Sequence, residues 1–329
     1  MEKSENLIWG IIGVGDVCEK KSAPALYKVP HSKVKTVMRR NEEKVKDYAQ
    51  RHNIPHYTTS ADDILSDPEI NAVYIATPPA SHAAYAKLCA AAGKITYVEK
   101  PMALSFKECE EMNKVFKEAD LTLYVAYYRR ALPNFLKVKS ILEEGTIGEV
   151  RMVQVQLYQK PKQVDFESGA DNWRVQPEVA GGGYFHDLAS HQFDILDFLL
   201  GPIKEARGIA VNQAKLYTAE DAVTAHWIFE NGALGSGNWC FTTAEMAEKD
   251  LITIVGNKGK VSFATFANSE VFLETDSGTS QRFNFEMPEH IQYPLIESMV
   301  AEVLGNGKCA STGDSAARTN QVLDWICQK

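Results

Sequence analysis

Short apolar runs alternate with longer amphipathic stretches through the first 126 residues, and this alternation restricts the possible folds more than any other feature of the sequence. The apolar runs have the length of strands, and the stretches between them have the spacing of helices that bury one face. Strands that alternate with helices predict βαβ units around a parallel sheet. We expect strands over residues 7–12, 33–38, 72–76, 95–98 and 123–126, and helices over 41–52, 81–92 and 105–119.

After residue 146 the pattern changes to strands that follow one another directly. The Asn231-Gly232 pair is a strong hairpin signal, and strands joined by hairpins form antiparallel sheets. We expect strands over 149–158, 206–211, 223–230, 233–241, 251–255, 260–263, 271–273 and 281–285, and helices over 183–200, 295–304 and 314–327. The predicted fold is an α/β Rossmann domain with a doubly wound parallel sheet, residues 1–126, followed by an α+β domain with a large, mainly antiparallel open sheet, residues 127–329.

Composition and charge disfavour several classes of protein. The chain has 329 residues, with 35 Lys and Arg against 43 Asp and Glu, and its net charge of −8 argues against nucleic acid as a partner. It has no apolar run of about 18 residues and its first residues carry no basic export signal, so we expect neither a membrane span nor export. The six cysteines are scattered without a CxxC pair, which favours a reducing cytoplasm over a disulfide framework.

Gly13 and Gly15 follow the first expected strand. In a dinucleotide-binding turn the first glycine makes the tight turn, and the second lets the backbone approach the pyrophosphate. Cys18 stands at the third position in place of Gly or Ala, and it is small enough for close helix–strand packing. We expect these glycines and the adjoining Asp16 and Val17 to bind a nicotinamide dinucleotide; an ordinary glycine turn is the alternative.

Arg39 and Arg40 follow the second expected strand, where NAD enzymes usually carry an acid that accepts from the ribose 2′-hydroxyl. Two guanidinium groups favour a 2′-phosphate, which their planar fork of donors can hold. We therefore expect NADP(H) rather than NAD(H). The alternative is that both arginines are solvated loop charges; we assign Glu42 and Glu43 to the next helix.

Further polar residues follow two of the expected strands, at the sheet edge where open α/β folds bind ligands. Lys100 is expected beside the nicotinamide, where its ammonium polarises a carbonyl oxygen; a solvated surface lysine is the alternative. His82 opens a helix, and it either contacts the cofactor or lines the turn. The cofactor-binding residues expected at this edge are Thr77, Pro78, His82, Glu99 and Lys100.

Asp187 and His191 are four residues apart in the long expected helix, so they share one face. The imidazole of His191 suits general acid–base catalysis, and Asp187 could orient it or anchor a substrate hydroxyl. A structural Asp–His hydrogen bond and a metal site are the alternatives. His186 diverges from His191 around the helix, and no third ligand stands at a recognisable spacing, so we expect no metal.

These motifs occur in the order of one known family. Gly13-x-Gly15, Ala76-Thr77-Pro78, His82, Glu99-Lys100-Pro101, glycines 181–183 and Asp187-x-x-x-His191 together resemble the Gfo/Idh/MocA oxidoreductases, the glucose–fructose oxidoreductase and inositol dehydrogenase family, over nearly the whole chain. Within the family, the pattern looks closest to NADP-dependent members such as 1,5-anhydrofructose reductase, with dihydrodiol dehydrogenases a near second.

The resemblance implies hydride transfer between the nicotinamide and a sugar, polyol or related hydroxy or oxo compound, with Lys100, Asp187 and His191 as catalytic residues. It places Arg129, Trp173 and Arg174 near cofactor or substrate; a stacked cation–π pair on the surface is the alternative for Trp173 and Arg174. It also implies a homo-oligomer, a dimer or tetramer, built through the C-terminal sheet. Two other functions occur on this fold and stay open: an NAD-dependent glycoside hydrolase and a non-catalytic cofactor-sensing regulator. The regulator ranks last, because such proteins commonly lose the lysine or histidine.

Overall fold

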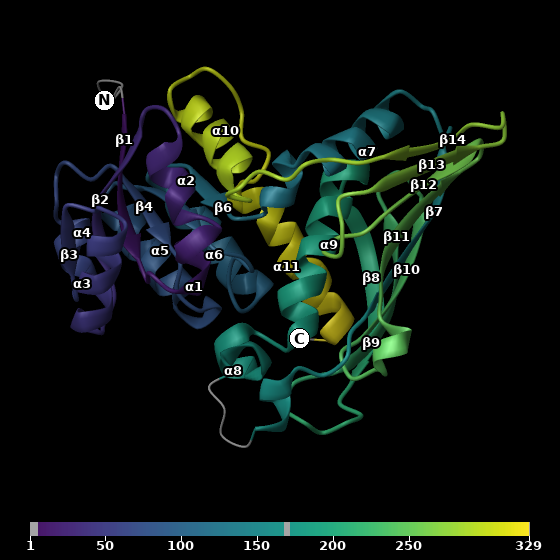
Figure 1. The fold of residues 1–329 in the computed structure, drawn as a ribbon, viewed down its shortest axis with the longest axis horizontal. Helices are drawn as coiled ribbons and strands as arrows, with labels where there is room; N and C mark the ends of the chain where they lie inside the picture. The colour runs from purple at the N-terminus through teal and green to yellow at the C-terminus, as the bar shows by residue number, and fades with distance from the viewer. Residues whose placement is uncertain (1–5, 168–171, 329) are drawn as a thin grey trace. The chain divides into compact units, whose positions relative to one another are not determined.

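The computed structural model describes residues 6–167 and 172–328 (Figure 1). The chain forms two compact units. Unit 1 comprises Met1–Ala103, Lys107–Ala131 and Pro288–Ala317, and unit 2 comprises Leu104–Phe106, Leu132–Met287 and Arg318–Lys329. Within the described ranges, no helix is both long and apolar enough to cross a membrane.

Unit 1 is built around a six-stranded parallel sheet with the strand order β3-β2-β1-β4-β5-β6. This is the order of a doubly wound sheet, whose switch point lies between β1 and β4. The strands are β1 (Leu7–Ile12), β2 (Ser32–Met38), β3 (His56–Thr58), β4 (Ala72–Ile75), β5 (Ile95–Val98) and β6 (Leu123–Val125). The helices are α1 (Asp16–Lys20), α2 (Ala23–Lys28), α3 (Glu42–Arg51), α4 (Ala61–Leu65), α5 (His82–Ala91), α6 (Phe106–Glu118, all but its first residue) and α10 (Tyr293–Val303), with the 3₁₀ turns η1 (Pro79–Ser81) and η2 (Tyr128–Ala131).

Helix α10 lies far along the chain yet belongs to unit 1, where it packs against α2 (Figure 1). Its side chains Leu295, Ile296 and Met299 are buried in the same core as Trp9 and Ile11 of β1. From the sequence we expected this segment in the second domain, after a boundary at residue 126. An apolar stripe predicts that one face of a helix is buried, but it does not show against which domain that face packs. The sequence therefore could not assign α10 to unit 1.

Unit 2 contains an eight-stranded sheet with the order β14-β13-β12-β11-β7-β10-β9-β8. All neighbouring strands in it are antiparallel except β7 and β10, which are parallel. The strands are β7 (Val150–Tyr158), β8 (Ile203–Val211), β9 (Ala222–Phe229), β10 (Leu234–Cys240), β11 (Lys249–Gly256), β12 (Gly259–Phe263), β13 (Val271–Thr275) and β14 (Ser280–Phe283). The helices are α7 (Pro133–Glu143), α8 (Pro177–Ala180), α9 (Tyr184–Leu200) and the last part of α11 (Gly313–Cys327), with the 3₁₀ turns η3 (Gln163–Phe166), η4 (Trp173–Val175) and η5 (Glu245–Ala247).

Helix α9 covers one face of the eight-stranded sheet through aromatic contacts (Figure 1). The ring of Phe193 lies 5.2 Å from Trp227 of β9, and the ring of Phe185 lies 5.1 Å from Trp239 of β10. Both pairs meet edge to face, an arrangement that stabilises by about 0.5–1.5 kcal/mol beyond the buried area. These contacts fix which side of α9 faces the sheet.

The predicted fold class is confirmed, and every strand and helix expected from the sequence is present to within three residues. The sequence pattern did not predict β3, α1, α2, α4, α7 and α8. Strand β3 has three residues, and α1 and α4 have five each, so these elements are too short to show a hydrophobic period.

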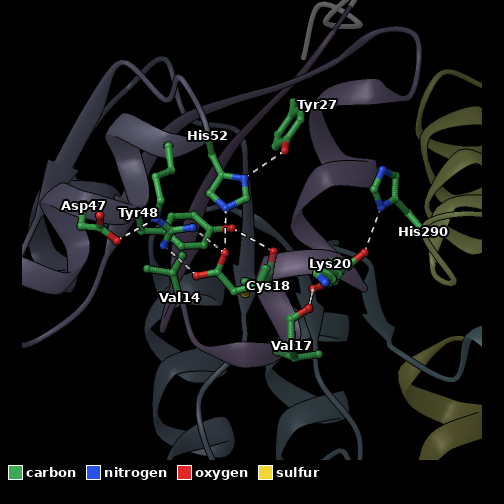
Figure 2. A network of polar contacts seen from close by, with 12 residues as sticks. Val14, Val17, Cys18, Lys20, Tyr27, Asp47, Tyr48, His52 and His290 are labelled. Atoms are coloured by element: carbon green, nitrogen blue, oxygen red, sulfur yellow. Dashed lines mark hydrogen bonds and ion pairs between the residues drawn. The ribbon is translucent and has the colours of Figure 1, made fainter.

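The short helix α1 depends on side chains from other parts of unit 1 (Figure 2). The last carbonyl groups of a helix have no partner within it. Here the Tyr48 hydroxyl donates to the carbonyl of Cys18 at 2.9 Å, and Nδ1 of His290 lies 2.9 Å from the carbonyl of Lys20. Residues from α3 and from the segment before α10 thereby hold the end of α1 in place.

Glu19 of α1 gives this network a dependence on pH. Its carboxylate accepts from Arg51 at 2.8 Å and lies 3.0 Å from Nε2 of His52. The hydrogen bonds from Arg51 lower the pKa of Glu19 from 4.5 to about 2. Because the folded-state pKa is the lower one, the stabilisation by Glu19 is complete above the unfolded-state pKa and is lost as the pH falls toward 2.

We expect Glu19→Gln to lower the free energy of unfolding at pH 7 by no more than about 1 kcal/mol, because the Glu19 side chain is 37% exposed. The deficit should shrink as the pH falls from 7 to 3. Urea unfolding at both pH values measures it, with Glu118→Gln as the control, since Glu118 forms only a 3.9 Å surface pair with Lys114. A deficit that is the same at both pH values would contradict this account.

Candidate active site

The turns after β1 and β4 meet at the switch point of the six-stranded sheet. Gly13 has a φ of +94°, and a Cβ atom there would lie 2.5 Å from Cγ2 of Thr77. At Gly15 a Cβ atom would meet no heavy atom of the described residues within 4 Å. The turn therefore packs tightly against Thr77 at Gly13 and leaves open space at Gly15. A pyrophosphate needs such open space to approach the backbone. The residues present fit a dinucleotide.

Cys18 takes the third position of the glycine turn as a packing residue. Its side chain is fully buried, and its backbone N–H donates to the carbonyl of Gly15 at 2.9 Å. Burial raises the pKa of the Cys18 thiol to about 12, so the thiol stays protonated and unreactive. Of the other two residues expected in this turn, Asp16 is exposed and Val17 is half-buried.

Arg39 lies beside the glycine turn. Its Nη1 donates to the carbonyl oxygen of Val14 at 3.1 Å, a contact that occupies one of the five guanidinium N–H groups. Arg40 is exposed, while Glu42 and Glu43 lie in the first turn of α3, as expected. At the position where NAD enzymes typically carry an acid, this chain has Arg39. The hydrogen bond to the Val14 carbonyl holds the Arg39 guanidinium at the glycine turn.

The Glu99 carboxylate forms a buried network with α10 rather than ending at the surface. Its Oε1 accepts from the hydroxyl of Tyr74 at 2.6 Å and from Nε2 of Gln292 at 2.8 Å, and Gln292 also accepts from the hydroxyl of Tyr97 at 2.6 Å. Its Oε2 accepts from the backbone N–H of the half-buried Lys100 at 3.2 Å. Glu99 therefore positions the lysine backbone.

His82 joins the turns after β4 and β5. It is fully buried, with Nε2 2.7 Å from the carbonyl oxygen of Thr77 and Nδ1 3.1 Å from that of Pro101. Burial lowers the pKa of the imidazole. This geometry favours the second of the two roles considered for His82, lining the turn. Thr77 itself is half-buried, and Pro78 is exposed.

Arg129 is also buried within unit 1, with its guanidinium 4.9 Å from the centre of the Tyr128 ring. The next residue, Arg130, donates to the carbonyl oxygen of Ala310 at 3.0 Å. This contact ties the turn after β6 to the segment that follows α10.

Gln292→Ala should lower the free energy of unfolding by about 1.5–3 kcal/mol, because it removes a donor from the buried Glu99 carboxylate and an acceptor from the Tyr97 hydroxyl. Urea unfolding measures the loss. Gln281→Ala in the exposed strand β14 is the matched control, with an expected change within about 0.5 kcal/mol. Equal effects of the two substitutions would contradict the proposed role of Gln292.

In unit 2, three consecutive glycines precede α9, and each has little room for a side chain. Gly181 has a φ of +84°, and a Cβ atom there would lie 3.0 Å from the carbonyl oxygen of Leu104. At Gly182 a Cβ atom would lie 2.0 Å from Nδ1 of His186, and at Gly183 it would lie 2.8 Å from Cβ of Ala219. The glycines let the chain pack closely before α9 begins.

Asp187 lies in the first turn of α9 with its side chain 16% exposed. Its Oδ2 lies 3.6 Å from Nε of Arg174, whose guanidinium stacks 4.6 Å from the centre of the Trp173 ring. The positive end of the helix dipole and the arginine guanidinium both attract this carboxylate. The structure thus brings together three of the residues expected at the site.

His191 lies one turn further along α9 and is 4% exposed. Its ring packs edge to face with Phe266, with 5.8 Å between the ring centres. The Asp250 carboxylate holds Phe266 in place, because it accepts from the backbone N–H groups of residues 265 to 267 at 2.6–3.0 Å. No sequence pattern indicates Phe266 or Asp250, since both lie more than fifty residues from His191.

His186 pairs with Glu220. Its Nδ1 lies 3.1 Å from Oε1 of Glu220, and the backbone N–H of Gly183 donates to the same oxygen at 3.0 Å. Burial raises the pKa of Glu220, but the interactions with His186 and Gly183 outweigh it and hold the pKa at about 2. Glu220 is therefore ionised at neutral pH.

The sheet order, with the glycine turn at its switch point, defines a dinucleotide-binding protein. Residues 7–127 match the family model of the NAD-binding Rossmann fold of the oxidoreductase family, and residues 135–262 match that of the GFO/IDH/MocA C-terminal domain. The chain belongs to the Gfo/Idh/MocA family of NAD(P)-dependent oxidoreductases.

Individual relatives agree with this assignment. The chain is 37% identical to Oxidoreductase P35 of Formosa agariphila, over 97% of this chain and 98% of that protein. It is 28% identical to trans-1,2-dihydrobenzene-1,2-diol dehydrogenase of Bos taurus, over 77% of this chain and 72% of the relative. Among solved structures, a levoglucosan dehydrogenase in complex with NADH and levoglucosan shares the fold, with a TM-score of 0.87 and 22% identity over 98% of this chain and 96% of that one.

Proposed function

We propose that the chain is an NADP(H)-dependent oxidoreductase acting on a sugar, polyol or related hydroxy or oxo compound. The observation that carries the proposal is the arrangement on α9, where Asp187, paired with Arg174, lies one turn before the buried His191. The names of relatives support the substrate class, because both levoglucosan and dihydrobenzene diols carry the hydroxyl groups that such chemistry oxidises.

Each residue has a distinct part in this proposal. Nicotinamide, when bound, supplies hydride transfer. Gly13 and Gly15 bind its pyrophosphate, and the Lys100 ammonium stabilises negative charge on the substrate oxygen. His191 exchanges the proton of that oxygen, and Asp187 orients the hydroxyl and the imidazole. Lys100 belongs to unit 1, and Asp187 and His191 belong to unit 2.

The preference for NADP(H) rests on Arg39. Its contact with Val14 holds the guanidinium at the glycine turn, where a ribose 2′-phosphate can receive a charge-assisted hydrogen bond. A 2′-hydroxyl has no charge to pair with this group. Arg40 is exposed beside it and is the second candidate for the phosphate.

We also propose a cytoplasmic homo-oligomer, a dimer or tetramer, formed through the eight-stranded sheet. Large apolar side chains on four strands are exposed: Ile209 at 64%, Leu234 at 51%, Met152 at 44% and Phe272 at 37%. Exposed apolar groups of this kind favour association. All six cysteines are free thiols, which is consistent with a reducing compartment.

His191→Asn should lower kcat by about 10²–10⁴-fold with little change in cofactor affinity, because the imidazole acts only when the proton moves. The assay follows NADPH or NADP⁺ against a panel of sugars, polyols and oxo-sugars, and tryptophan fluorescence reports cofactor binding. His56→Asn, at an exposed position in β3, is the control. Near-normal turnover of the variant would remove His191 from the mechanism. Release of aglycone from a nitrophenyl glycoside without net cofactor turnover would instead favour the hydrolase.

Arg39→Asp should shift the ratio of kcat/KM with NADPH to that with NADH toward NADH by about 10- to 150-fold, the value of a charged contact worth about 1.5–3 kcal/mol. The new carboxylate repels the 2′-phosphate and accepts from a 2′-hydroxyl. Lys46→Asp, an equal charge change at an exposed position of α3, should leave the ratio unchanged. A wild-type preference for NADH would refute the proposed cofactor.

A further inference from the structure

Three side chains that can bind a metal meet in unit 2, although they are distant in the sequence. His186 lies in the first turn of α9, Glu220 lies just before β9, and Cys327 is the last residue of α11. One ligand atom from each of the three lies within 4.8 Å of the other two. No sequence spacing reveals this cluster, because more than a hundred residues separate Glu220 from Cys327.

Two of the three donors already have the separation that a metal ion requires. Zinc is bound tetrahedrally with bonds of about 2.0–2.2 Å to nitrogen and oxygen, so neighbouring ligand atoms lie roughly 3.3 Å apart. Nδ1 of His186 and Oε1 of Glu220 are 3.1 Å apart. The distance from Sγ of Cys327 to the other two ligand atoms is at most 4.8 Å. A shift of little more than about 1 Å would therefore bring the sulfur to bonding distance of the same ion.

The surroundings suit a divalent ion of intermediate softness. His186 is 2% exposed and the Glu220 side chain is 14% exposed, so charge here is poorly solvated. A carboxylate and a thiolate together balance the charge of a divalent cation, which reduces the cost of burying all three groups. Imidazole nitrogen, carboxylate oxygen and thiolate sulfur are together typical ligands of zinc.

We propose that His186, Glu220 and Cys327 bind one divalent transition-metal ion, with zinc as the ion that the donors favour and water in the fourth position. On binding, the thiol proton leaves to solvent and the imidazole keeps a single proton on the nitrogen that does not bind the metal. The ion links the end of α11 to the first turn of α9. This proposal does not depend on the proposed enzymatic function.

The test uses the full chain, stripped with a chelator and titrated with Co²⁺ and then with Zn²⁺. We expect one Co²⁺ per chain, a thiolate-to-cobalt charge-transfer band in the near ultraviolet, and displacement of cobalt by zinc. Cys327→Ser should abolish the band and weaken zinc binding by more than the about 10- to 100-fold that loss of an outer-shell partner causes. Cys240→Ser, at another half-buried cysteine, should behave as wild type.

A second measurement needs no substitution. Zinc should slow alkylation of Cys327 in the wild-type chain, followed by peptide mass spectrometry, and should leave the rate at Cys240 unchanged. A charge-transfer band that persists in Cys327→Ser would overturn the proposal. Absence of the band in wild type, together with an alkylation rate at Cys327 that zinc does not alter, would overturn it as well and would leave a plain His186–Glu220 hydrogen bond.

Discussion

The buried carboxylate of Glu99 connects the parts of unit 1 on which the candidate cofactor site depends. A carboxylate in this position is tolerated only when its oxygens are hydrogen-bonded. Tyr74 on β4, Gln292 before α10 and the backbone of Lys100 provide those bonds. The Glu99 carboxylate therefore links the end of β5 to β4 and to the segment before α10, and it holds the backbone of Lys100 in place.

The sequence predicted those features of the molecule that have a local period or a local motif. Strands such as β1 and β5 carry apolar runs, and the glycine turn and the Asp187/His191 pair follow from spacings of two and four residues. The turn after β1 takes the form that the two glycines indicated, with a positive φ at Gly13 and open space at Gly15. The roles of these residues in catalysis and cofactor binding remain predictions.

Contacts between distant segments could not be predicted in this way. Gln292 meets Glu99 across 193 residues, and Glu220 meets His186 across 34, so no pattern within one helix or strand contains either pair. Phe266 packs against His191, and Asp250 holds the backbone of Phe266; the eight-stranded sheet brings both residues to His191. In each case the sequence does not show which distant residues meet, and tertiary structure alone decides that.

The place of α10 in unit 1 has a consequence for the order in which the chain folds. Residues 1–131 leave the ribosome first, but their core lacks Leu295, Ile296 and Met299 until α10 has been made. Until then Glu99 also lacks Gln292. The cofactor-binding unit, although it is translated first, therefore cannot complete its core until most of unit 2 has been synthesised.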